Sequence, residues 1–132
     1  MVGAAGTILH STGGGTWGAQ SSGTAQDLNA VWANGSGNVY AVGNNGTIRH
    51  STGGGTWSAH TSGTTQRLRG VWGSGSDDVY AVGDNGTILH STGGGVWTAQ
   101  PSTTTQILNG VWGSGIGDVF VVGVGGAILH RP

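Results

Sequence analysis

The sequence predicts an all-β protein, specifically a β-propeller of four-stranded antiparallel blades with about three blades in the chain. Three observations lead to this prediction. A unit of forty residues is repeated, each unit contains four short β-type runs, and several of those runs are apolar on both faces. A repeat of this length is typical of propellers and other repeat arrays.

The repeat begins at Leu28, returns at Leu68 and starts again at Leu108. Residues 44–83 and 84–123 are identical at 27 of 40 positions. We therefore expect the whole chain, 1–132, to form a single propeller segment. The predicted repeats are 28–67, 68–107 and 108–132 (the last one partial), with the back half of a further repeat at 3–27.

The copy that starts at Leu68 shows how one unit divides into strands. A run from Leu68 ends at a Gly-Ser-Gly turn, and Val-Tyr-Ala-Val-Gly follows at 79–83. Asn85-Gly86 separates that run from Thr-Ile-Leu-His-Ser, and this dipeptide is a strong hairpin signal because both residues tolerate positive φ. Three glycines precede the fourth run, Val-Trp-Thr-Ala-Gln, at 96–100. The pattern predicts a four-stranded meander without any helix.

The runs do not alternate between apolar and polar residues. Residues 79–82 are apolar in succession, and so are Val71 and Trp72. Strands that are buried on both faces have this composition. A blade packed between two neighbouring blades is buried in this way, which favours a propeller.

A further pattern lies at the end of each unit, where a serine precedes a glycine-rich turn and a tryptophan follows. The serines are Ser11, Ser51 and Ser91, and the tryptophans are Trp17, Trp57 and Trp97. This pattern resembles the Asp-box (BNR) repeat of sialidase-like and Ycf48-like propellers, whose box runs Ser-x-Asp-x-Gly-x-x-Trp. Here the box is one residue shorter, and its Asp is replaced by Gly13, Gly53 and Gly93. The resemblance implies a propeller fold and a structural, non-catalytic role for the box.

The number of strands predicts association. Three blades in one ring are too few, whereas two chains supply about six, within the range of known propellers. We expect a homodimer that closes one six-bladed ring, because closed cyclic symmetry is the rule for homo-oligomers. One strand per chain, at 7–10 or 127–130, would then be surplus.

The composition excludes several partners. The chain has four arginines, five aspartates, no lysine and no glutamate. Such a chain has no basic surface for nucleic acid or for anionic lipid, so neither nucleic acid nor a membrane is expected as a partner. It has no cysteine, and its N-terminus does not have the pattern of a secretory signal, so the sequence leaves the compartment open.

Four histidines share one repeat position, and His60 lies elsewhere in the unit. A ring of imidazoles could bind a metal or respond to mild acid. The sequence shows no carboxylate and no second histidine near them at ligand spacing, so we expect no metal site and no cofactor. Each histidine is expected to bond to the backbone of a turn. The four are His10, His50, His90 and His130.

The six tryptophans form two sets. The set in the box, Trp17, Trp57 and Trp97, is expected to pack between blades. The other set lies beside Gly-Ser turns at the blade rim, where aromatic faces could stack on sugar rings. The candidate ligand-binding residues are Trp32, Trp72, Trp112, Asn34, Ser74 and Ser114.

No pattern of catalytic residues is present. The chain lacks glutamate, its Asp77–Asp78 pair lies in a turn, and no serine lies in a G-x-S-x-G elbow. We therefore predict a non-catalytic binding module, with repeated sites for glycans as a lectin would have. The alternative is a structural or engineered symmetric propeller fragment without a ligand of its own.

Overall fold

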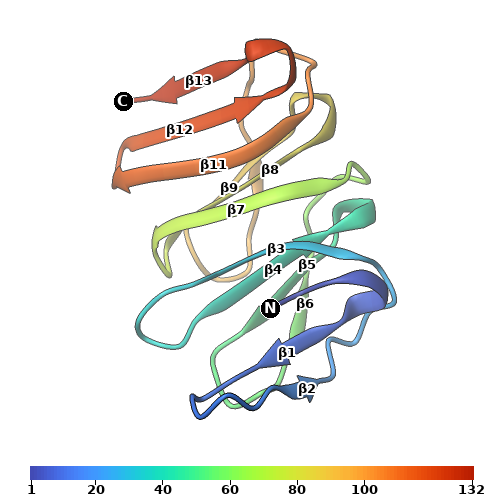
Figure 1. The fold of residues 1–132 in the computed structure, drawn as a ribbon. Coiled ribbons are helices and arrows are strands. Elements are labelled where there is room, and N and C mark those ends of the chain that lie inside the picture. The colour runs from blue at the N-terminus through green and yellow to red at the C-terminus, as the bar shows by residue number, and fades with distance from the viewer.

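The computed structural model describes all residues 1–132, and its regular secondary structure is almost entirely β. Thirteen strands form four antiparallel sheets that follow one another along the chain. In Figure 1 these sheets are stacked in sequence order from the N-terminus to the C-terminus. No helix is long and apolar enough to cross a membrane.

Two of the sheets are complete four-stranded meanders, as the repeat predicted. The first blade has the strand order β3-β4-β5-β6, and the second has the order β10-β9-β8-β7. Their strands are β3 Leu28–Ala33, β4 Val39–Gly43, β5 Ile48–Ser51, β6 Ser58–His60, β7 Leu68–Gly75, β8 Asp78–Gly83, β9 Ile88–Ser91 and β10 Thr98–Ala99.

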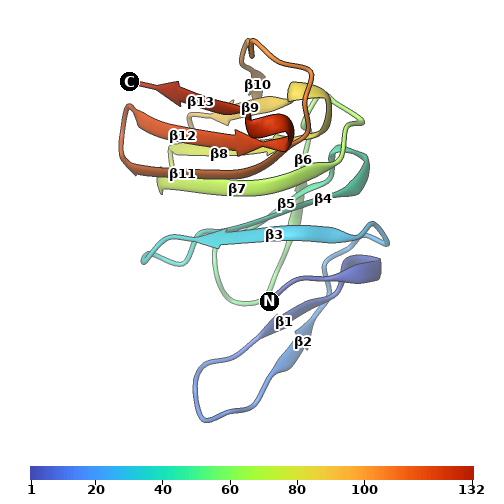
Figure 2. The same cartoon turned by 45° about the horizontal axis from the view of Figure 1, so that its top comes forward.

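The sheets at the two ends of the chain have fewer strands. The N-terminal hairpin consists of β1 and β2, and the C-terminal sheet has the order β11-β12-β13. Figure 2 shows this hairpin standing apart from the tightly stacked remainder. The strands are β1 Ile8–His10, β2 Gly18–Gln20, β11 Leu108–Gly115, β12 Asp118–Gly123 and β13 Ile128–Arg131.

The fourth strand of each unit is shorter than the sequence predicted. We expected Val-Trp-Thr-Ala-Gln to form it, but β10 covers only Thr98–Ala99. Trp97 lies before the strand and turns into the space between two blades, where it is 8 % exposed. Trp97 therefore packs between the blades and is not part of the sheet.

A 3-10 turn joins the second and third strands of each unit and fixes the approach to the next blade. In η3, Asp84–Gly86, Asn85 has φ 55° and Gly86 has φ 66°. This confirms the positive φ expected for Asn-Gly. A Cβ on Gly86 would collide with the carbonyl oxygen of Thr104, so glycine is required here for close contact as well as for conformation. The equivalent turns are η1 Ala4–Gly6, η2 Asn44–Gly46 and η4 Val124–Gly126.

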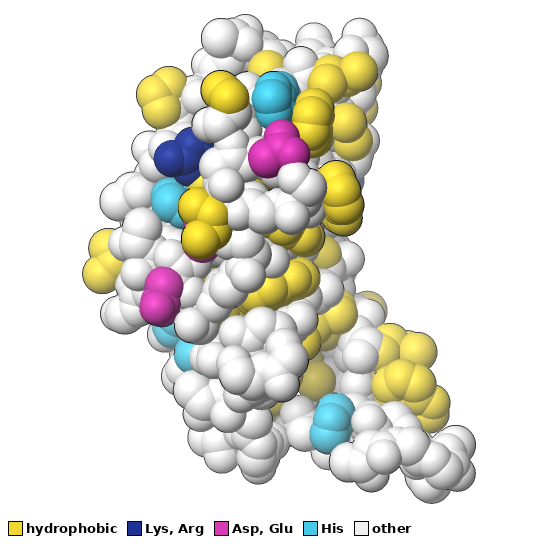
Figure 3. Space-filling view, turned by 90° about the vertical axis from the view of Figure 1, so that its left-hand side faces the viewer, with side chains coloured by type: hydrophobic (Ala, Val, Ile, Leu, Met, Phe, Trp, Pro, Cys, Tyr) yellow, Lys and Arg dark blue, Asp and Glu magenta, His cyan; other side chains and the backbone are white.

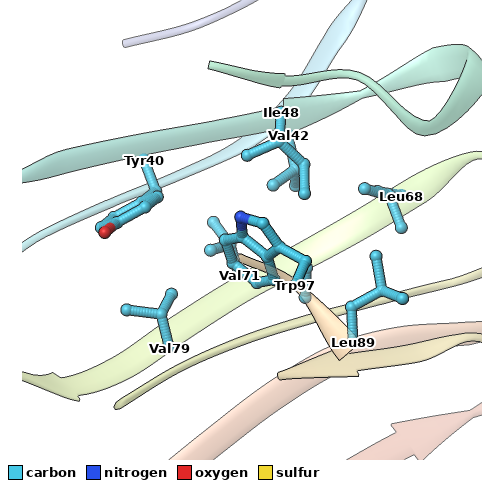
Figure 4. Close-up of a cluster of buried hydrophobic side chains, with 9 residues drawn as sticks. Tyr40, Val42, Ile48, Leu68, Val71, Val79, Leu89 and Trp97 are labelled. Atoms are coloured by element: carbon cyan, nitrogen blue, oxygen red, sulfur yellow. The ribbon is translucent and has the colours of Figure 1, made fainter. Parts of the chain in front are cut away.

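The main core lies between the two complete blades. Figure 4 shows side chains of the first blade facing those of the second across the interface, with Trp97 among them. The cluster has nine buried members, of which Val42, Leu68 and Val79 are fully buried. Each such side chain stabilises the fold by about 1.5–3 kcal/mol. Burial of both sheet faces explains why these strands do not alternate in polarity.

Trp32 of β3 and Trp72 of β7, each in the first strand of its blade, extend this packing from one blade to the next. Trp32 lies against Gly73, where an added Cβ would come within 2.8 Å of its Cη2 atom. Trp72 lies against Gly113 in the same way, at 2.5 Å. The absence of a side chain at these two glycines lets neighbouring sheets approach closely.

Candidate functional site

A polar groove opens between the first and second blades, with a cavity volume of about 580 Å³. We call it the histidine groove. The first blade contributes aromatic and imidazole side chains from three strands, and the second blade contributes two turns. Its principal lining residues are Tyr40, His50, His60, Asp77 and Gly93–Gly95.

The two imidazoles lie close together beside a phenol ring. The His50 and His60 rings have centroids 4.9 Å apart. Tyr40 stacks on His50 at 4.5 Å and meets His60 edge-on at 6.0 Å. The strand register explains this arrangement, because Tyr40 of β4 pairs with His50 of β5, and His60 of β6 lies diagonally from His50 on the same face.

Hydrogen bonds fix which imidazole nitrogen carries a proton. Trp97 donates its indole N–H to Nδ1 of His60 at 3.3 Å, so Nδ1 accepts and the proton of neutral His60 is on Nε2. Nε2 of His50 lies 3.0 Å from Oδ1 of Asn38. An amide oxygen only accepts, so Nε2 of His50 donates and its Nδ1 is an acceptor. The groove therefore presents one imidazole donor and one imidazole acceptor.

The protonation of both histidines is biased towards the neutral form. Burial lowers the pKa of His50, and the charge of neighbouring His60 lowers it further. Burial also lowers the pKa of His60, with an additional contribution from the Arg49 guanidinium. Desolvation disfavours a charged imidazole, and a nearby positive charge acts in the same direction.

Asp77 supplies the negative charge of the groove from the turn between β7 and β8. Its Oδ1 atom faces Gly93, where an added Cβ would lie 2.6 Å away. Together with burial, which is the larger effect, the Asp77 charge raises the pKa of Tyr40. The hydroxyl of Tyr40 thus stays protonated, and it lies 3.4 Å from the carbonyl oxygen of Ser76.

Two of the four histidines at the shared repeat position, His90 and His130, have carboxylate partners, which corrects our expectation. His90 Nε2 lies 2.8 Å from Asp78 Oδ1, and His130 Nε2 lies 2.8 Å from Asp118 Oδ1. They bond to side chains rather than to turn backbone, because His90 lies opposite Tyr80 in the hairpin and Asp78, two residues before Tyr80, is its diagonal neighbour on the same face. The expectation that no second histidine lies nearby was also wrong for His50, which has His60 beside it.

These carboxylates also accept a hydrogen bond from a serine. Ser114 Oγ donates to Asp118, and the equivalent Ser74 donates to Asp78. The Ser114 bond, followed by the His130 bond, lowers the pKa of Asp118. The aspartate lies between serine and histidine, so the serine is not hydrogen-bonded to the imidazole as a triad nucleophile is. In the first blade, Asn38 takes the place of the aspartate.

The predicted ligand-binding residues occupy two kinds of place. Trp32 and Trp72 are half-buried against the next blade, whereas Trp112, with no sheet beyond it, is 61 % exposed. Ser74 and Ser114 bond within their own hairpins, and the side chain of Asn34 accepts from the backbone N–H groups of Ser36 and Asn38. None of the six residues lines a cavity, and a role for them in ligand binding stays a prediction.

Sequence reasoning missed the histidine groove. The signal was present at His60, which stands where the other units have Gln20 and Gln100. At this repeat position the side chain accepts a hydrogen bond from the tryptophan of the next unit, since Trp57 donates to Gln20 at 2.8 Å. A single glutamine-to-histidine difference at a blade interface therefore marks the groove.

Comparison with solved structures identifies similar folds. The structure of YCF48 from Cyanidioschyzon merolae, a β-propeller, has a TM-score of 0.78 and 18 % sequence identity. The matched region covers 95 % of this chain and 44 % of the YCF48 chain. A structure described as YCF48 bound to D1 peptide has a TM-score of 0.70 and 22 % sequence identity. The matched region covers 80 % of this chain and 37 % of that chain.

These similarities confirm the propeller-type fold that the repeat predicted. The chain spans less than half the length of the two solved structures. No protein-family model matches the sequence, and no curated protein matches it.

Proposed function

We propose that the chain is a non-catalytic binding module whose histidine groove holds a short extended segment of another protein. The observation that carries this proposal is the hydrogen-bonding character of the groove. It offers the N–H of His60, an acceptor nitrogen on His50 and the carboxylate of Asp77. An extended peptide presents one N–H and one C=O per residue and can complement both kinds of group.

The floor of the groove favours a peptide over a sugar. Recognition of a sugar ring by stacking needs an accessible aromatic face, and Tyr40 is only 3 % exposed. Three consecutive glycines, 93–95, form the opposite wall and leave backbone groups accessible to an extended chain. Asp77 adds selectivity for a segment with a basic side chain or a free N–H at that position.

The surface charge agrees with a small, selective site rather than a large electrostatic one. Figure 3 shows a face on which the charged side chains are few and most of the surface is uncharged. The solved structure described as YCF48 bound to D1 peptide is an example of a protein of similar fold with a bound peptide. That binding is a property of YCF48, and here it serves only as support for the proposed class of partner.

Selection from a phage library of random 12-residue peptides on the immobilised chain tests the proposal. His60→Gln is the decisive variant, because glutamine at this repeat position keeps the tryptophan acceptor and removes the imidazole. Asp77→Asn removes the charge. The matched control is Gln20→His, which places a histidine at the same repeat position outside the groove.

We expect selected peptides to bind the unchanged chain and the Gln20→His control equally. Binding to Asp77→Asn should be at least about tenfold weaker, which corresponds to the loss of one charge-assisted hydrogen bond. Binding to His60→Gln should also be weaker, because the imidazole N–H that contacts the peptide is lost. Equal binding to all variants would contradict the proposal. A glycan array run in parallel that shows binding lost in Trp112→Ala would favour a lectin instead.

A further inference from the structure

A second groove, with a cavity volume of about 360 Å³, opens beside the C-terminal sheet. We call it the C-terminal groove. It is more apolar than the histidine groove and is formed by the second blade, the segment after β10 and the strands β12 and β13. Its walls include Tyr80, Ile88, Gln100, Pro101, Val121 and Leu129.

The C-terminal groove is the repeat equivalent of the place where Trp97 is buried. Trp97 lies 5.9 Å from the Tyr40 ring and donates its indole N–H to His60. It also shares a buried cluster with Ile48, Ala81 and Leu89. These neighbours of Trp97 are Tyr40, His60, Ile48, Ala81 and Leu89. The residues forty positions after them are, in the same order, Tyr80, Gln100, Ile88, Val121 and Leu129. All five line the C-terminal groove, which contains no tryptophan.

Trp17 is at the same repeat position as Trp97 but is not buried between two blades. Trp17 precedes β2 as Trp57 precedes β6 and Trp97 precedes β10, but it is 54 % exposed. Trp57 donates to Gln20, and Gln100 is the glutamine at that position in the second blade. We infer that Trp17 of one copy of the chain fills the C-terminal groove of a second copy and donates its indole N–H to Gln100.

The strand next to Trp17 fits the edge beside the groove. In the N-terminal hairpin, β2 pairs with β1 in the register Ile8↔Gln20, Leu9↔Ala19 and His10↔Gly18. β13 begins with the same three residues, Ile128-Leu129-His130, and its outer edge has no partner strand. In the association, β2 exchanges β1 for β13 of the other copy and keeps an identical set of cross-strand neighbours. Exchange of an identical element is a low-cost route to dimers.

The exposed face of the C-terminal sheet agrees with this pairing. Val122 is 47 % exposed and Ile128 is 69 % exposed, whereas the equivalent Val82 is fully buried against the next sheet. Trp112 is exposed where Trp72 lies against Gly113. At the other end of the stack, Val31 is 40 % exposed where the equivalent Val71 is 9 % exposed. The exposed apolar face of the first blade in one copy can therefore cover the exposed apolar face of the C-terminal sheet in the other copy.

Two such contacts close a ring. Each chain contributes two complete blades, and each contact combines β11–β13 of one chain with β2 of the other into a further four-stranded blade. Two copies thus make six blades, within the range of four to eight typical of propellers. The groove also contains one charged side chain, Arg131, whose guanidinium lies 5.6 Å from the centre of the Tyr80 ring and which shifts aside when Trp17 enters.

Sedimentation velocity of the 132-residue chain tests the proposal. The unchanged chain should sediment as two copies of 13.1 kDa each. Trp17→Ala should raise the dimer dissociation constant at least tenfold, with an unchanged urea midpoint for the monomer because Trp17 is exposed there. The matched control is Val96→Ala, which removes an apolar side chain that is 64 % exposed and does not line the C-terminal groove.

Complementation separates this contact from non-specific association. Gln100→Arg blocks the groove at a half-buried position and leaves Trp17 intact. The Trp17→Ala chain alone and the Gln100→Arg chain alone should each be monomeric. An equimolar mixture of the two should form a one-to-one complex, in which Trp17 of the Gln100→Arg chain fills the groove of the Trp17→Ala chain. A monomeric unchanged chain, assemblies larger than two copies, or a Trp17→Ala chain that dimerises as well as the control would each overturn the proposal.

Discussion

The indole N–H of Trp97 donates to Nδ1 of His60 at 3.3 Å across the interface between the two complete blades. The equivalent bond one unit earlier joins Trp57 to Gln20 at 2.8 Å. One position in the repeat therefore links each blade to the next. In the link made by Trp97 the acceptor is the imidazole of His60, which connects the packing of the fold to the chemistry of the histidine groove.

The first prediction concerns the pH dependence of stability. Burial and neighbouring positive charge hold the pKa of His60 in the folded chain below its unfolded value of about 6.5. Above that value neither state is protonated. As the pH falls below it, the unfolded chain binds protons first, so the free energy of unfolding decreases until the folded pKa is passed.

Urea titrations between pH ~7.5 and ~5 measure this effect. His60→Gln should weaken the decline in stability and leave part of it, because the pKa of His50 is lowered for the same physical reason. An identical decline in the variant would show that His60 is not the group that titrates.

The second prediction concerns the close approach of blades at Gly73. Gly73→Ala should destabilise the chain by about 1–3 kcal/mol, because the new Cβ meets Trp32 Cη2 and the carbonyl oxygen of Asp78, each at 2.8 Å. Gly75→Ala is the matched control in the same strand, since a Cβ there meets nothing within 4 Å. Urea denaturation of both variants measures the difference. Equal stabilities would mean that Trp32 does not pack tightly on Gly73.

The third prediction concerns the bond between Asp78 and His90. Asp78→Ala should cost about 1–3 kcal/mol, because it leaves the His90 nitrogen and the Ser74 hydroxyl without their acceptor. Asp78→Asn should cost less, because Asn38 bonds to His50 through its amide oxygen in the first blade. Thermal or urea unfolding distinguishes the two. An asparagine variant as unstable as the alanine variant would contradict this interpretation.

Much of the fold could be predicted from local sequence. The period of forty residues and the Asn85-Gly86 turn give the meander of each blade, because turn conformation and strand length depend on nearby residues. The structure confirms the four-stranded order in both complete units. The six-bladed dimer, the glycan sites and the role of Trp112 stay predictions.

The histidine groove could not be predicted in the same way. His60 and Trp97 are 37 residues apart and meet only after two blades have stacked. The Asp78–His90 pair depends on hairpin register, which makes these two residues, twelve positions apart, diagonal neighbours on one face. Such contacts arise from packing, and the repeat indicates them only where one copy differs from the others, as at His60.

In the proposed dimer a tryptophan fills each inter-blade pocket, and hydrogen exchange at the indole N–H groups tests this directly. Six tryptophans give six indole signals in a ¹⁵N-labelled chain, and Trp17→Phe assigns the signal of Trp17. We predict that the Trp17 N–H becomes protected from exchange as the protein concentration rises, to the level of the Trp57 N–H, and that the protection of Trp57 stays constant. A Trp17 N–H that exchanges as freely in the dimer as in the dilute monomer would contradict it.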